Sequence, residues 1–299
     1  YQAVAIYAMG KSYGEDQLMG PVDWKQDPKN ALGKMIATYL RDGDWNICLK
    51  WAFDNGLKVN PDETTYDPNA INFIATSENM DASAKWIAGY CEPRKLIVNG
   101  KKVSQDTSVC VDAIAVWTPA DVDAAEKKGG LVTIASTKQY SSQMPNITFT
   151  IKKYANDHRS DVEAMISALA QAGDQVRSFK EAKLFAAQVS AKVYDQNDAK
   201  FWLTYYDGVK KKDLQGLSVN LGGSMAFNLA DAANMFGLGT DRIDRYKAVY
   251  TTFGDILVKM HPEIVASYPA YKDVVDKSFL GSVISNNPEL LEGKPLVTT

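Results

Sequence analysis

Two segments place an acidic residue and an aromatic ring at a predicted helix start, a combination that can bind a small molecule without reacting with it. The first, Asp42-Gly43-Asp44-Trp45-Asn46, follows one apolar run and opens an amphipathic one. In open α/β sheets, ligands bind beyond the carboxyl ends of strands, where helix N-termini carry unpaired N–H groups. Asp42 or Asp44 would cap the helix, Trp45 would form a flat apolar wall and Asn46 would lie beside them. The alternative is an ordinary acidic N-cap followed by a core tryptophan.

The second segment repeats this arrangement. A buried run ends in Trp117-Thr118-Pro119, and Asp121 lies in the helix that follows. Thr137 ends the next predicted strand and belongs to the same rim. Trp117 has an alternative role as core filler, since aromatic side chains usually serve packing.

A third segment, Leu221-Gly222-Gly223-Ser224, opens a predicted helix and could present backbone amides to an anion. No Gly-x-Gly-x-x-Gly or Walker lysine pattern accompanies it. The alternative is a tight turn into a packed helix.

The sequence offers little for catalysis. His158 and His261 are the two histidines, and neither lies in a His-x-x-x-His or Gly-x-Ser-x-Gly pattern. The three cysteines, Cys48, Cys91 and Cys110, are not spaced as Cys-x-x-Cys pairs. We therefore predict a protein that is not an enzyme, with no metal and no cofactor.

Cys91 and Cys110 flank a short predicted hairpin at Lys95–Lys102. A disulfide between them is reasonable if the protein is exported. Two buried free thiols are the alternative.

Composition narrows the class of protein. The chain has 299 residues, 45% hydrophobic and 23% charged, with a net charge of −3. Without a basic stripe, we expect no nucleic-acid partner. No apolar run approaches the roughly 20 residues of a membrane-spanning helix.

Strand-length apolar runs alternate with amphipathic segments, which predicts an α/β fold. The predicted strands are Ala3–Met9, Met35–Tyr39, Val109–Trp117, Leu131–Ala135 and Ile147–Lys152. The predicted helices are Trp45–Asn55, Met80–Tyr90, Ala120–Lys128, Asp161–Ala172 and Phe179–Tyr194, and after Gly223 nearly everything is expected to be helical.

Two irregular segments, Lys11–Ala31 and Thr137–Asn146, are expected to cross between lobes. They predict one lobe inserted into another. Residues 1–20 would give a first-lobe strand and crossover, 21–215 the inserted second lobe with connecting helices, and 216–299 a mainly helical return to the first lobe with a C-terminal tail.

Several segments resemble the nitrate, sulfonate and taurine-type solute-binding proteins of ABC transporters and, more widely, the thiamine-pyrimidine synthase family. They are Cys110–Asp121, Gly129–Thr137 and Leu221–Ser224. Ser12–Gln17, Asp42–Asn46 and Gln143–Pro145 further resemble bacterial substrate-binding-like domains that precede an OmpA-like peptidoglycan-binding domain.

The resemblance implies a type II periplasmic-binding-protein fold, with two lobes, mixed sheets and a ligand cleft between the lobes. The first lobe is expected to lack its N-terminal block, and Pro295–Thr299 would begin a linker to an OmpA-like domain. The predicted ligand-binding residues are Ser12, Asp16, Asp44, Trp45, Asn46, Trp117, Thr118, Asp121, Thr137, Gly223 and Ser224.

The implied function is non-catalytic binding of a small solute in the periplasm, for ABC-type uptake or sensing, with an ABC permease or other cell-envelope proteins as partners. One alternative is a structural cell-envelope protein that uses the fold as an interaction scaffold. Another is an iron-dependent enzyme similar to thiamine-pyrimidine synthase, for which the two histidines are poorly placed. The ligand's charge stays open, because Asp44 favours a cation or hydroxyl whereas helix N-termini favour an anion.

Overall fold

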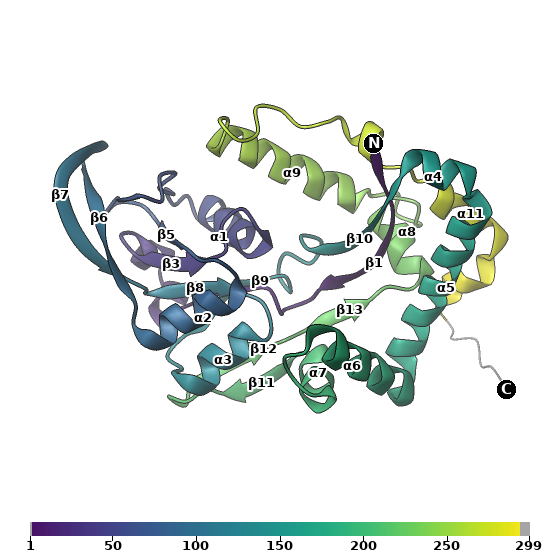
Figure 1. Ribbon diagram of the computed structural model, residues 1–299, viewed down its shortest axis with the longest axis horizontal. Coiled ribbons are helices and arrows are strands. Elements are labelled where there is room, and N and C mark those ends of the chain that lie inside the picture. The colour runs from purple at the N-terminus through teal and green to yellow at the C-terminus, as the bar shows by residue number, and fades with distance from the viewer. Residues whose placement is uncertain (1, 294–299) are drawn as a thin grey trace. The chain divides into compact units, whose positions relative to one another are not determined.

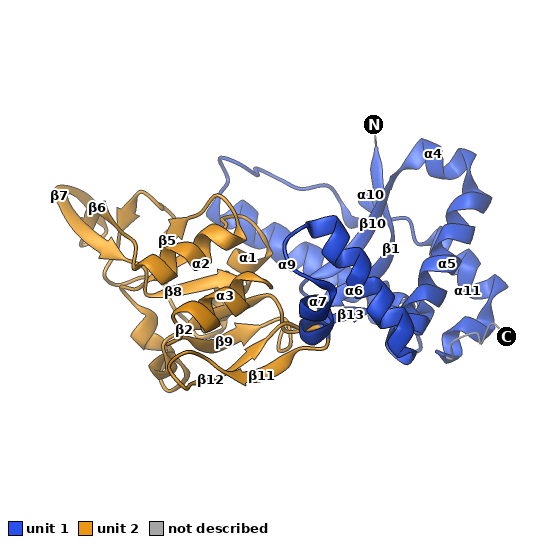
Figure 2. Ribbon diagram, turned by 60° about the horizontal axis from the view of Figure 1, so that its bottom comes forward, with its two compact units in different colours: residues 1–12, 142–206, 224–299 blue, residues 13–141, 207–223 orange. Residues whose placement is uncertain are grey.

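The computed structural model describes residues 2–293, so the predicted linker at 295–299 lies outside the described residues. The chain forms two compact units (Figure 2). Unit 1 comprises the described parts of 1–12, 142–206 and 224–299, and unit 2 comprises 13–141 and 207–223. The chain therefore passes from one unit to the other four times.

Unit 2 is built around a five-stranded mixed sheet with the order β5-β3-β8-β2-β9 (Figures 1 and 2). The strands are β2 (Gln17–Gly20), β3 (Met35–Thr38), β5 (Asn72–Ala75), β8 (Ala113–Val116) and β9 (Val132–Ser136). β3 is parallel to β5 and β8, whereas β2 is antiparallel to β8 and β9. Helices α1 (Gly43–Asp54), α2 (Asn79–Ala88) and α3 (Ala120–Lys127) follow β3, β5 and β8.

The central strands are short and almost completely buried. Every residue of β2, β3 and β8 is buried. This explains why β8 is apolar throughout and why β3 is apolar as far as Ala37, without alternation. Helix α1 packs against β2, β8 and β9, and it buries Ile47 and Leu49. Trp51 of the same helix stacks on Trp24, with ring centroids 6.0 Å apart.

Smaller strands complete unit 2. β6 (Cys91–Val98) and β7 (Lys101–Cys110) form a hairpin that is longer than predicted, and β4 (Thr65–Tyr66) pairs with β6. A Cys91–Cys110 disulfide joins the base of the hairpin, and Cys48 is a buried free thiol. β11 (Val209–Lys212) pairs with β12 (Ser218–Leu221).

Unit 1 contains a three-stranded antiparallel sheet with the order β10-β1-β13 (Figure 1). These strands are β1 (Ala3–Ser12), β10 (Pro145–Ile151) and β13 (Ser224–Ala226). The helices are α4 (Lys152–Asp157), α5 (Arg159–Ser178), α6 (Lys180–Tyr194), α7 (Ala199–Tyr206), α8 (Leu229–Met235), α9 (Arg245–Met260), α10 (Tyr271–Val274) and α11 (Ser278–Asn286). Short 3-10 helices lie at Val22–Lys25 and Pro28–Ala31 in unit 2 and at Pro288–Glu292 in unit 1.

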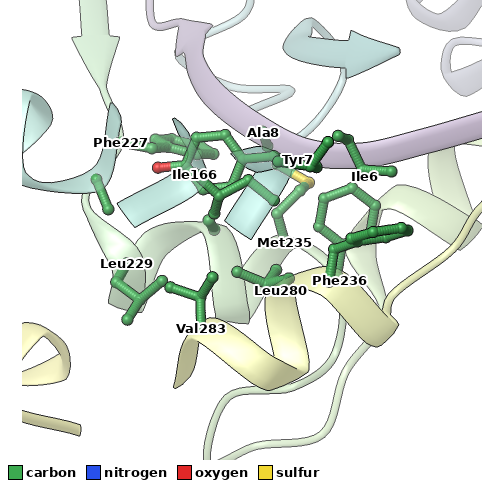
Figure 3. Close-up of a cluster of buried hydrophobic side chains, with 14 of the residues drawn as sticks. Ile6, Tyr7, Ala8, Ile166, Phe227, Leu229, Met235, Phe236, Leu280 and Val283 are labelled. Carbon is green, nitrogen blue, oxygen red and sulfur yellow. The ribbon is translucent and has the colours of Figure 1, made fainter. Parts of the chain in front are cut away.

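The core of unit 1 lies between β1 and its helices (Figure 3). Tyr7 of β1, Ile166 of α5, Phe236 beside α8 and Leu280 of α11 are buried there together. These segments are far apart in sequence, so unit 1 closes only when the last third of the chain packs on its first strand.

The predicted boundaries differ from this division. Residues 142–206 belong with unit 1, because β10 pairs along β1 from Ala3↔Ile151 to Lys11↔Pro145 and α5 packs on β1. Residues 13–20 belong with unit 2, because β2 lies inside its sheet.

Two predicted elements are also wrong. The helix predicted from Ser224 begins only at Leu229, where Asn228 forms a capping box with Asp231, and Ser224–Ala226 is a strand. The predicted strand Val109–Trp117 is interrupted at Asp112, whose carboxylate accepts the Met35 backbone N–H at 3.0 Å. The run is divided between two sheets, because Cys110 ends β7 in the β4-β6-β7 sheet and Ala113 begins β8 in the five-stranded sheet.

We predict a large difference between two phenylalanines in helices of unit 1. Phe279 in α11 is fully buried against the Arg159 guanidinium, whereas Phe185 in α6 is 67% exposed. Phe279→Ala should lower the free energy of unfolding by about 3–5 kcal/mol through loss of apolar burial and an unfilled cavity. Phe185→Ala, which makes the same change in helix propensity, should lie within about 0.5 kcal/mol of the parent. Urea unfolding measures both, and equal effects would contradict the assigned core.

Candidate functional site

The candidate site lies at one edge of the unit 2 sheet. β3, β8 and β9 end at this edge, and the antiparallel β2 begins there, because Gln17 pairs with both Val116 and Ser136. The predicted residues Asp16, Trp117, Thr118 and Thr137 adjoin these ends in sequence. Open α/β sheets bind ligands at this edge.

Asp44, in the first turn of α1, is 1% exposed. Neither of its carboxylate oxygens accepts a hydrogen bond from a donor among residues 2–293. Burial raises its pKa well above the usual value, and the charges of Asp16 and Asp42 raise it further. Asp44 and Asp16 are therefore neighbours that cannot both ionise freely.

The backbone of Asp16 is fixed by Thr137, which is buried. The Thr137 N–H donates to the Asp16 carbonyl oxygen at 3.1 Å, and the Gly14 N–H donates to the Thr137 hydroxyl at 2.8 Å. Thr137 thus positions the segment that carries Asp16.

Asp121 bonds within unit 2. Its carboxylate accepts the Gln17 side-chain amide at 3.1 Å, the Gly222 N–H at 3.0 Å and the Val122 N–H at 2.7 Å. Burial raises its pKa to about 6, and the hydrogen bonds from Gly222, Val122 and Gln17 oppose the shift. These bonds connect the start of α3 to β2 and to the turn after β12. The Asp121 carboxylate therefore holds these elements of unit 2 together.

Gln17 completes this network and was missed by the sequence reasoning. It is fully buried, its amide also donates to the Asn220 carbonyl, and its oxygen accepts the Thr133 hydroxyl at 2.7 Å. Gln17 lies in the segment Lys11–Ala31, which was expected to be an irregular crossover, so no pattern in the sequence marked it.

The two tryptophans differ in burial. Trp45 is 3% exposed and meets Phe73 edge-on at a centroid distance of 6.2 Å, which matches the alternative of a core tryptophan. Trp117 is half-buried, and its backbone N–H and carbonyl both bond the Asn79 side-chain amide. Asn79 opens α2, and no sequence signal distinguished it.

Buried polar atoms without a partner gather at this edge. Among the described residues they include the hydroxyl of Thr38, which ends β3, and the side-chain oxygen of Asn46, in the first turn of α1. Each such group costs free energy unless something binds it.

Gly223 does not present amides from a helix start, so that expectation is wrong. Its carbonyl accepts the Tyr13 N–H at 2.8 Å, its φ is +116°, and a Cβ would lie 2.5 Å from the Tyr13 carbonyl oxygen. Ser224 pairs with Ser12 in the β1–β13 ladder. Ser12 and Ser224 therefore belong to unit 1, whereas the other predicted site residues belong to unit 2.

Unit 2 also contains a cavity of about 350 Å³, lined among others by Tyr13, Gly14, Ser136, Lys138 and Lys210. Of its lining residues, Gly14 lies two positions before Asp16 and Ser136 immediately precedes Thr137. The Lys138 ammonium lies over the Tyr13 ring, 5.8 Å from the ring centroid. Within residues 2–293, no group of three or more histidine, cysteine or acidic residues could hold a metal ion. No helix in the described part of the chain is long and apolar enough to cross a membrane.

Asp44→Asn gives a prediction about pH. The pKa of Asp44 is higher in the folded protein than in the unfolded chain. At any pH between these two pKa values, the folded protein keeps a proton on Asp44 that the unfolded chain has already released. The stability from this group is therefore full below about pH 4 and is lost as pH rises. The stability of Asp44→Asn relative to the parent should increase with pH over that range, by up to about 1.4 kcal/mol per pH unit.

Thermal or urea unfolding at pH 4.5 to 7.5 would measure this difference, with Asp106→Asn on the exposed β7 as the matched control. The control should follow the parent at all pH values. A pH-independent difference for Asp44→Asn would contradict the buried carboxyl pair.

Comparison with known proteins identifies the fold. No protein-family model matches the sequence, and no curated protein matches it. Among solved structures, a protein described as the periplasmic sulfonate-binding protein SsuA of a sulfonate ABC transporter, from Methylobacillus flagellatus KT, is similar over the whole chain. The TM-score is 0.58 at 12% identity, and the match covers 100% of this chain and 73% of that chain. The mixed sheets, the two units and this similarity show that the chain has the two-lobed α/β fold of type II periplasmic binding proteins.

Proposed function

We propose that the chain binds a small solute, without chemistry, as the substrate-binding component of an ABC-type uptake or sensing system in the periplasm. The fold supports this role, and the similar structure is described as a periplasmic binding protein of an ABC transporter. The observation that carries the proposal is the set of buried, unpartnered polar atoms at the carboxyl edge of the unit 2 sheet.

Asp44 is the strongest member of that set. A buried carboxyl group with no donor is unfavourable in a molecule selected only for stability. A binding protein needs such groups, because a ligand that satisfies them binds with the specificity of a polar site. In this proposal Asp16, Asp44, Asn46 and Thr118 contact the solute, and Thr137 and Asp121 hold the surrounding backbone.

The predicted binding between the two lobes and the partnership with a permease are part of this proposal. A structural role in the cell envelope and the link to an OmpA-like domain stay predictions of the sequence alone.

A panel of solutes tests the function. Sulfonates, amines, nucleobase-like rings and inorganic oxyanions are titrated by calorimetry and by thermal shift. A true solute should stabilise the protein by about 2.7 kcal/mol at 100 times its Kd, because it binds the folded state only. Small-angle scattering should show a more compact particle with that solute, as expected of hinge closure.

The control is the same panel with a protein whose site is altered at Asn46 and Thr118 (Asn46→Ala/Thr118→Val), which should lose the stabilisation while its own unfolding stays cooperative. No stabilisation or compaction with any solute in the panel would contradict solute binding.

A further inference from the structure

One edge of the unit 1 sheet has no neighbouring strand. β10 lies at the end of the three-stranded sheet with β1 on one side, and no strand among residues 2–293 pairs with its other side (Figure 1). The outer backbone N–H and C=O groups of an end strand have no partner in the sheet. They form a template on which a further strand can pair.

Two hydrogen bonds show which backbone groups of β10 face this free edge. The Lys152 N–H donates to the Gln2 carbonyl oxygen at 2.9 Å, and the Met144 carbonyl oxygen accepts the Ser12 N–H at 3.0 Å. The residues on either side of β10 therefore both turn their backbone toward β1. The register shifts lie on the β1 side, so β10 keeps the strand period of two between these residues. The backbone groups that point to the free edge are those of Ile147, Phe149 and Ile151.

The side chains of the same three residues share one face of β10, because side chains alternate along a strand. Ile147 packs against the unit 1 core. Phe149 and Ile151, further along the strand, are 58% and 43% exposed. The apolar face of β10 therefore continues beyond the part that the core covers.

β10 also lacks the features that usually keep an edge strand from pairing, which are short length and charged side chains. Six other edge strands of the described sheets, β4, β5, β9, β11, β12 and β13, have at most five residues. β7 has ten residues, but it carries Lys101, Lys102 and Asp106. β10 has seven residues, none of them charged, and its one proline is the first residue.

We propose that the free edge of β10 is the interface of a symmetric dimer, in which β10 of a second copy pairs antiparallel with it. The two unit 1 sheets then form one continuous sheet. Antiparallel pairing about a two-fold axis uses the same edge in both copies, so assembly stops at the dimer. This inference goes beyond the proposed function and does not depend on it.

A second copy suits this edge because the outward-facing residues are complementary to themselves. With Phe149 on the two-fold axis, its backbone N–H and C=O pair with those of Phe149 in the second copy. Ile147 then pairs with Ile151 at both ends of the contact. Every outward-facing backbone group of these residues gains a partner, and apolar side chains meet on one face.

The same register is also favourable at the residues between them. Thr148 lies opposite Thr150 of the second copy, and threonine pairs stabilise neighbouring strands. Lys152, the first charged residue after β10, lies opposite Asn146. No like charges are therefore placed opposite each other.

Sedimentation velocity at chain concentrations from about 1 μM to about 1 mM tests the dimer. One strand from each copy makes a small contact, so we expect a weak dimer whose fraction rises with concentration. Phe149→Lys should weaken it at least about tenfold, because two ammonium groups would meet at the axis. The matched control is Phe185→Lys, at a phenylalanine of α6 that is 67% exposed, and it should leave the dimer unchanged.

Hydrogen exchange measured by NMR on the parent identifies the strand without a variant. In the dimer the N–H groups of Ile147, Phe149 and Ile151 gain acceptors, so their exchange should slow as the dimer fraction rises. The N–H groups of Thr148 and Thr150 already face β1 and should change much less. If Phe149→Lys does not fold, this measurement decides the matter.

Three results would overturn the proposal. The first is a chain that stays monomeric over the whole range of concentration. The second is a dimer that Phe149→Lys does not weaken and that forms without slower exchange at Phe149, because another surface would then hold the two copies together. The third is slow exchange at Ile147, Phe149 and Ile151 in a monomeric chain, because another polypeptide segment would then cover the edge.

Discussion

The candidate site depends on the position of β2. Every backbone polar group in a buried strand needs a partner, and a strand of four residues finds partners on both sides only by lying between two others. β2 does so between β8 and β9, with the opposite direction to both. Because it runs antiparallel, its first residue lies where its neighbours end. The residue before it, Asp16, is thereby delivered to the edge at which β3 leads into α1 and Asp44.

A hydrogen-bonded network keeps β2 in that place. Gln17 bonds Asp121, Asn220 and Thr133, and Asp121 in turn accepts the Gly222 amide. These are buried side chains with satisfied oxygens and amides, which rigidify the structure around them. The carboxyl group of Asp44, in the same unit, accepts no hydrogen bond from the described residues. The Asp121 carboxylate thus has three hydrogen-bond donors, whereas the Asp44 carboxyl group has none among the described residues. Asp44 lies at the edge of the sheet where ligands bind in this fold, which is where such an exception is expected.

The two units are compact for different reasons. Unit 2 contains most of its sheet within one continuous stretch, 13–141, and receives only the β11–β12 hairpin from later in the chain. Unit 1 is assembled from three separated segments, and β1 is the strand on which the other two converge. Since β1 leads directly into the segment with Asp16, the same stretch of chain organises the core of unit 1 and supplies part of the candidate site.

The sequence by itself determined the α/β class and the main strands, because a fully buried strand such as Ala113–Val116 is apolar throughout. It also determined that Asp44 starts a helix after a strand. It did not reveal β2, whose four residues lie between Gly14 and Pro21 and carry no periodicity, and it therefore missed Gln17. It also treated Ser224 as a helix start, although the partner that makes it a strand, Ser12, comes more than two hundred residues earlier. Only the tertiary structure decided that Asp16 lies close enough to the buried Asp44 to raise the pKa of its carboxyl group. Their meeting depends on strand order and direction, which follow from long-range backbone pairing and leave no local pattern of residues.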